Sequence, residues 1–179
     1  MPLHPTCSRA PSQVELIHAF PYESSRKRMS VIVRLPPKLL EVVGGGSPVR
    51  LYCKGADSVL CDSSSGVLEL GSRGSDEASM QKLDALLYEW ADIALRTLVF
   101  AKREIPDFEE WNAKYVAAIN DPEQVRRAKA KEPNEIARLQ AIVENGLTLQ
   151  GATAIEDKLQ DGVPEILADL RSAGIKVCT

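Results

Sequence analysis

The sequence predicts an α+β fold in which a twisted antiparallel sheet is flanked by helices. Residues 14–20, 29–35 and 49–53 are short aliphatic and β-branched runs, and no helical pattern separates them. Successive strands without helices between them favour antiparallel pairing. The segment between the second and third runs contains three consecutive glycines flanked by prolines, which predicts a long hairpin loop. A fourth strand is expected at 97–102.

Helical patterns follow the third run. Ser75 is expected to cap a helix whose apolar residues recur at spacings of three and four. Asp107 with Glu110 forms a capping-box pattern that opens a second helix. A charged helical stretch is expected from 121 to 144, interrupted near Pro133. The apolar stripes of the first two helices are assigned to the core: Met80, Leu83, Leu87, Trp90, Ala94, Trp111, Tyr115 and Ala118.

The pattern changes after Gly146, where a strand, a helix and the start of another strand follow in that order. This order is typical of one βαβ unit of a parallel sheet, here incomplete. We therefore expect residues 1–13 to be a flexible N-terminal edge and residues 14–146 to form the α+β domain. Residues 147–179 are expected to be an incomplete βαβ piece of an α/β domain.

Composition limits the function classes. Hydrophobic residues make up 44% and charged residues 26% of the chain, the balance of a soluble globular protein. The net charge of -3 provides no basic field for nucleic acid or anionic membranes, so a bound anion must be held by a local cluster. No apolar run approaches the roughly 20 residues that span a bilayer. With two histidines and no CxxC spacing among four cysteines, no metal site is expected.

Three cationic segments are candidates for such a cluster. Arg26, Lys27 and Arg28 stand at the entrance to a strand, where a cation can face an anionic ligand. Lys54 ends the next strand, and Gly55 beside it would allow close approach to a phosphate. Arg96 lies at a helix-to-strand junction, where it can fork onto phosphate oxygens or cap the helix C-terminus. Taken alone, the RKR segment also fits a solvated basic turn, the four residues of KGAD are weak evidence, and Arg96 fits a helix cap better.

Taken together, these segments resemble the type IV P-type ATPases, the phospholipid flippases. The resemblance rests on ESSRKRMSVIVR, YCKGADSVL, ALRTLVFAKREI, GATAIEDKLQDGVPEIL and AGIKV, in that order and spacing. It implies that residues 14–146 are the nucleotide-binding domain and residues 147–179 part of the phosphorylation domain. It also implies a cytosolic domain of an integral membrane protein.

The resemblance further implies a nucleotide site. The family's adenine ring stacks on an aromatic residue five positions before the lysine of RKRMS, which is Tyr22 here, although phenylalanine is usual. Phe20 is the alternative platform, since alternation in a strand would place both rings on one side. Residues carried over to the ATP site are Tyr22, Lys27, Met29, Lys54, Gly55, Arg96 and Leu98.

The family's activity needs parts that this sequence does not contain. The phosphorylated Asp-Lys-Thr-Gly-Thr motif is absent, so no catalytic residue is assigned and the chain alone is expected to be inactive. In the full transporter, ATP and Mg²⁺ would drive phospholipid to the cytosolic leaflet, with an accessory β-subunit as a further partner. The alternative is a non-binding interaction module, with Ser30 of RKRMS as a kinase target.

Overall fold

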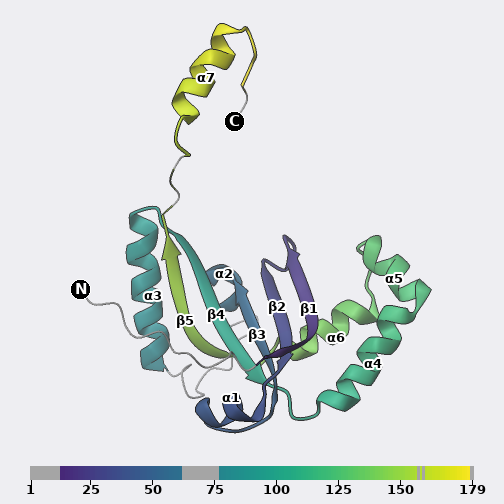
Figure 1. Cartoon of the computed structure of the whole chain (residues 1–179). Coiled ribbons are helices and arrows are strands. Elements are labelled where there is room, and N and C mark those ends of the chain that lie inside the picture. Colours follow the sequence, from purple (N-terminus) through teal and green to yellow (C-terminus); the bar gives the residue numbers. More distant parts are fainter. Residues whose placement is uncertain (1–12, 62–76, 157, 159, 178–179) are drawn as a thin grey trace.

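The computed structural model describes residues 13–61, 77–156, 158 and 160–177 (Figure 1). Its elements are β1 (Glu15–Glu23), β2 (Arg28–Arg34), α1 (Pro37–Val42), β3 (Val49–Gly55), α2 (Asp57–Leu60), α3 (Glu77–Asp92), β4 (Arg96–Glu104), α4 (Phe108–Asn120), α5 (Pro122–Lys129), α6 (Glu135–Val143), β5 (Thr148–Ile155) and α7 (Val163–Ser172).

The strands form one five-stranded sheet in the order β1-β2-β3-β4-β5, and every neighbouring pair is antiparallel. Figure 1 shows α3 beside β5 at one end of the sheet and α4 and α6 near β1 at the other. The predicted sheet with flanking helices is confirmed, and all four expected strands of the first domain are present.

One face of the sheet carries the core. Because side chains alternate along a strand, every second residue points to the same face. The buried face presents Ile32 from β2, Leu51 from β3 and Val99 from β4, each inaccessible to solvent. The helices complete this cluster with Leu60, Leu83, Leu87, Phe108, Trp111, Tyr115, Ala118, Leu139 and Val143. The helical stripes expected in the core are found there, with Met80 and Trp90 partly buried at its edge. Ala94 is the exception: α3 ends at Asp92, and Ala94 is an exposed turn residue with a φ of 58°.

The helix starts follow the sequence signals only in part. Asn134 caps α6, since its Oδ1 accepts from the Ala137 amide at 2.8 Å. Asp121 caps α5 in the same way. By contrast, Asp107 precedes α4 as expected but makes no side-chain cap hydrogen bond. Its φ of -96° and ψ of 39° depart from the extended backbone that a capping residue normally adopts. Ser75 lies outside the described residues.

The segment expected to be a long hairpin loop contains a helix. α1 begins directly after Pro36 with Pro37 in its first turn, a position where the missing amide hydrogen costs nothing. Only the glycines after it form the irregular turn, with φ values of 88°, 79° and 87° at Gly44, Gly45 and Gly46. The apolar residues of this segment therefore form a helical turn before the chain enters β3.

β5 differs from the expected arrangement. Instead of starting a parallel βαβ unit, it pairs antiparallel with β4, from Arg96 opposite Ile155 to Lys102 opposite Thr148. The turn at Gly146, with φ of 64°, returns the chain from α6 to the open edge of β4, where unpaired backbone groups accept another strand. The domain division at 146 remains a prediction, but the sheet itself continues to Ile155.

The last described helix stands apart. α7 begins after Gly162 and has no buried residue. Figure 1 shows it away from the sheet, linked through the residues that follow β5. Residues 175–177 after it carry no strand, so the second strand of the expected βαβ unit is not seen among the described residues.

Candidate functional site

The face of the sheet opposite the core holds a shallow cavity of about 260 Å³. Met29, Lys54 and Phe100 lie side by side across β2, β3 and β4, because Met29 pairs with Lys54 and Lys54 with Phe100. Val31 and Tyr52 continue the lining. The cavity thus combines apolar and aromatic walls with one exposed ammonium group. Such a surface suits a flat, partly apolar ligand that carries negative charge.

Two more of the expected site residues extend this face along β4. Leu98 and Arg96 stand two and four residues before Phe100, so alternation places all three on the same side. Leu98 is half-buried opposite Thr153, and Arg96 is exposed at the start of the strand opposite Ile155. The predicted residues Met29, Lys54, Leu98 and Arg96 are therefore brought to one face by the strand register.

Gly55 has a steric role in the packing of the hairpin against β3. A Cβ at this position would lie 2.7 Å from the Arg28 Cβ and 2.8 Å from the Lys27 carbonyl oxygen. Next to Gly55, the Ala56 amide donates a hydrogen bond to the Lys27 carbonyl oxygen, in the turn between β1 and β2, at 3.0 Å. The glycine therefore admits the backbone of the hairpin, and its expected close approach to a phosphate stays a prediction.

The three cations of the RKR segment divide into two groups. Arg26 and Arg28 both bind the buried carboxylate of Glu144, at 2.9 Å each. Lys27 between them is exposed and adopts a φ of 49°, which non-glycine residues rarely take. Of the three, Lys27 is thus the residue with an exposed side chain at the hairpin tip.

The two aromatic residues of β1 have opposite environments. Phe20 is 1% exposed and its ring lies 5.5 Å from that of Tyr115, whereas Tyr22 is 60% exposed. The pairing of β1 with β2 shifts register between Phe20 and Glu23. Strict alternation, which would have placed both rings on one side, does not hold across such an irregularity. Phe20 is a core residue and cannot serve as an adenine platform, so Tyr22 remains the candidate.

Ser30 is not an accessible modification site. It is 1% exposed, and its hydroxyl donates to Glu144 Oε1 at 2.6 Å. It also hydrogen-bonds the thiol of Cys53, although burial has the larger effect and raises the pKa of that thiol. A kinase could reach Ser30 only by unfolding β2, which removes support for RKRMS as a phosphorylation motif.

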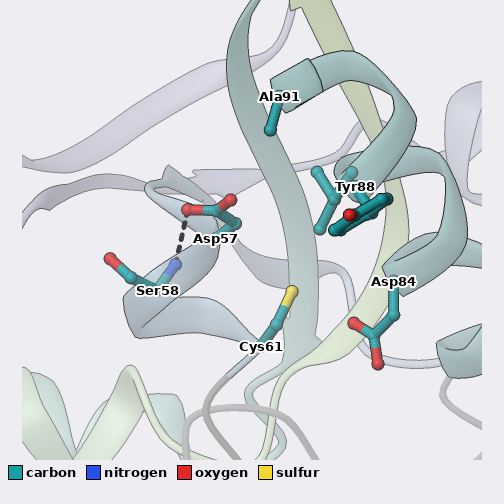
Figure 2. Close-up of a pocket in the computed structure, with 7 residues that line it drawn as sticks. Asp57, Ser58, Cys61, Asp84, Tyr88 and Ala91 are labelled. Carbon is teal, nitrogen blue, oxygen red and sulfur yellow. Dashed lines mark hydrogen bonds between the residues drawn. The ribbon is translucent and has the colours of Figure 1, made fainter.

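A larger cavity of about 480 Å³ lies between α2 and α3. Figure 2 shows Asp57 and Ser58 on the first helix, and Asp84, Tyr88 and Ala91 on the second. Burial, with Asp84 and Asp57 nearby, raises the pKa of the Cys61 thiol to about 11. The described residues that line this cavity include two carboxylates and no cation, which suits a polyphosphate poorly, so the smaller cavity is the better candidate.

No group of three or more His, Cys, Asp or Glu among residues 13–61, 77–156, 158 and 160–177 is arranged to hold a metal ion. Within the same residues, no helix has both the length and the apolar character needed to cross a membrane. Glu144, which sequence reasoning did not single out, emerges as the most buried carboxylate beside the predicted site.

Comparison with known proteins identifies the class. Residues 5–162 match the sequence profile of the P-type ATPase, cytoplasmic domain N. The chain therefore belongs to the P-type ATPase family, as the motifs indicated. It is 39% identical to the phospholipid-transporting ATPase DRS2 of Saccharomyces cerevisiae, over 92% of this chain and 11% of that protein. It is 37% identical to the human phospholipid-transporting ATPase ID, over 91% of this chain and 12% of the relative. The chain thus spans about a tenth of the length of these relatives.

Proposed function

We propose that this chain binds ATP on the open face of its sheet and acts as the nucleotide-binding part of a phospholipid-transporting P-type ATPase. The observation that carries the proposal is the row of Met29, Lys54 and Phe100 around the 260 Å³ cavity. A purine needs apolar walls, and its phosphates need cations. Here apolar walls and a cation occur together. Because the net charge of the chain is -3, local ammonium groups must supply the attraction for the phosphates.

The strand register of Met29, Lys54 and Leu98 supports one pose for the nucleotide. The base stacks on Tyr22 and contacts Met29 and Leu98, whereas Lys27, Lys54 and Arg96 face the phosphates. No carboxylate lines the cavity, so its described residues offer no ligand for the Mg²⁺ that phosphoryl transfer requires. The same transfer needs the aspartate nucleophile of the Asp-Lys-Thr-Gly-Thr motif, which the sequence lacks. Aspartyl-phosphate formation, phospholipid transport and an accessory β-subunit therefore belong to the proposed full-length transporter.

A titration with ATP tests the binding. We expect a dissociation constant on the order of 0.1 to 1 mM, because a few cationic contacts and one stacked ring offset only part of the cost of association. Amide chemical shifts should move around Tyr22, Lys27, Lys54 and Arg96. Lys54→Ala should weaken ATP and ADP alike. Unchanged shifts in all four neighbourhoods at millimolar ATP would instead favour the non-binding interaction module.

An activity assay tests the second part. Cations near a triphosphate do not hydrolyse it without a nucleophile, so the purified chain should show no ATP turnover. Turnover that increases with protein concentration and persists through further purification steps would contradict the assignment.

A further inference from the structure

Glu144 is a charged residue with no exposed surface, at the C-terminal end of α6. Its carboxylate accepts hydrogen bonds from Arg26 Nη1 at 2.9 Å, from Arg28 Nε at 2.9 Å and from Ser30 Oγ at 2.6 Å. All three donors come from the turn between β1 and β2 and from the first residues of β2. One buried carboxylate thus fastens a single hairpin to α6.

The carboxylate is itself fixed to the sheet. Arg103 on β4 donates to the carbonyl oxygens of Ile142 at 2.8 Å and Asn145 at 2.7 Å, so it holds the backbone on both sides of Glu144. Arg26 in turn donates from Nη2 to the Pro21 carbonyl at 2.9 Å, which ties the strand before the turn to the same cluster. The path from β4 through α6 to the hairpin therefore consists of direct hydrogen bonds.

This arrangement determines the position of Lys27. Its two neighbours both point into the Glu144 cluster, and its own carbonyl accepts from Ala56 beyond the end of β3. With both flanking residues and its carbonyl held, the backbone of Lys27 is confined to a φ of 49° while its side chain stays exposed. An unfavourable backbone conformation persists only where the surroundings impose it.

We propose that Glu144 is a positioning residue of the nucleotide site. It does not touch the ligand; it holds Arg26 and Arg28 so that the hairpin presents Lys27 and Tyr22 beside Lys54. The inference rests on the proposed function, because it concerns the geometry of that same site. It assigns the two arginines of the RKR segment to the scaffold and the lysine between them to the ligand.

A double-mutant cycle tests the proposal on the whole chain. Glu144→Gln keeps the shape of the side chain but removes the charge that both arginines bind. We expect it to weaken ATP binding about fivefold in the parent protein and about fivefold in a Lys54→Ala background. In a Lys27→Ala background the further loss should be only about twofold, because the contact that Glu144 positions is already missing. A general loss of structure would instead weaken binding equally in both backgrounds, which would overturn the proposal.

A second measurement needs no nucleotide. The Ala56 amide reports the docking of the hairpin, since it donates to the Lys27 carbonyl. Glu144→Gln should speed hydrogen exchange at Ala56 by about tenfold or more while exchange at Leu51, in the centre of the sheet, stays unchanged. Equal acceleration at both amides, or none at Ala56, would overturn the proposal. Glu109→Gln is the control, because it removes an exposed carboxylate that pairs with Arg34 at 3.4 Å.

Two further measurements apply if Glu144→Gln does not fold or if the parent protein does not bind ATP. If Glu144→Gln does not fold, Ser30→Ala removes one hydrogen bond from the same carboxylate and should give a smaller change of the same kind, about twofold in affinity. If the parent protein does not bind ATP, the proposed function fails, and the exchange at Ala56 alone then decides whether Glu144 holds the hairpin.

Discussion

The two faces of the sheet are built from alternate residues of the same strands, yet their side chains differ in burial and in role. On the covered face, Ser30, Ile32, Leu51, Cys53, Val99 and Ala101 are all buried. On the open face, their direct neighbours Met29, Val31, Tyr52 and Phe100 are half-buried and Lys54 is exposed. A shift of one residue thus separates side chains that stabilise the fold from side chains that are available to a ligand.

The composition of the open face differs from that of an ordinary solvated sheet face. Solvated faces of antiparallel sheets are normally polar, whereas Met29, Tyr52 and Phe100 place apolar and aromatic groups there. A contiguous apolar patch beside a lysine is typical of a binding surface. The comparison therefore predicts that substitutions on the covered face change stability and that substitutions on the open face change binding.

The largest expected effect is on the covered face. Phe20→Ala should lower the free energy of unfolding by about 3–5 kcal/mol, because it leaves a cavity among the rings of Trp111 and Tyr115. Tyr22→Ala on the same strand should change it by about 0.5 kcal/mol or less, since Tyr22 is exposed. Urea denaturation followed by circular dichroism measures both. Similar losses for the two variants would show that the faces are not separated at β1.

Gly55→Ala should have the next largest effect, with a loss of stability of about 1–3 kcal/mol. The added methyl group would meet the Lys27 carbonyl and the Arg28 side chain at distances that force the hairpin backbone to move. ATP affinity should fall with stability, because the displaced hairpin carries Tyr22 and Lys27. Gly146→Ala is a useful comparison, since nothing lies within 4 Å of its added Cβ and only its φ of 64° opposes the change. Normal stability and affinity in Gly55→Ala would contradict this account of the glycine.

At the exposed Tyr22, replacement by alanine (Tyr22→Ala) should weaken ATP binding at least about fivefold, because stacking of a base on an aromatic ring is worth roughly 1–3 kcal/mol. Tyr22→Phe should be nearly neutral, since a phenyl ring stacks as a phenol does. Isothermal titration of the folded variants provides the measurement. If Tyr22→Ala binds as tightly as the parent, the ring is a surface residue without a role in the site.

Much of the fold could be predicted from local patterns. The strands, the interruption near Pro133 and the core stripe of α4 follow from periodicity and turn residues, which act over a few positions. The pairing of β5 could not be predicted in this way. Its sequence fits a buried strand in either kind of sheet, and the direction of pairing depends on the turn at Gly146 and on the free edge of β4.

The residues of the candidate site likewise divide into those whose placement could be predicted from the sequence and those whose placement could not. Met29, Lys54 and Leu98 could be assigned to one site because their motifs resemble those of the family, and the strand register then places them on one face. The different roles of Arg26, Lys27 and Arg28 could not, because they depend on Glu144, which lies 116 to 118 residues away in the chain. No local pattern marks that glutamate, and only the folded structure brings it to the hairpin.

The smallest expected effect concerns Lys27, where stability and binding should separate. A non-glycine residue in the left-handed region costs roughly 1 kcal/mol, and Lys27 has a φ of 49°. Lys27→Gly removes this cost but gives the unfolded chain more freedom, which offsets a similar amount. The free energy of unfolding should therefore stay within about 0.5 kcal/mol of the parent value, whereas ATP affinity should fall about threefold through loss of one cation.

Lys27→Ala should show the same loss of affinity without relief of the backbone. Lys27→Val, whose branched side chain tolerates this conformation poorly, should lose about 1 kcal/mol of stability as well. Denaturation and titration of the three variants measure both quantities. A Lys27→Gly protein that loses stability and affinity together would assign this lysine to the fold, like its two neighbours, and would leave Lys54 and Arg96 as the cations of the site.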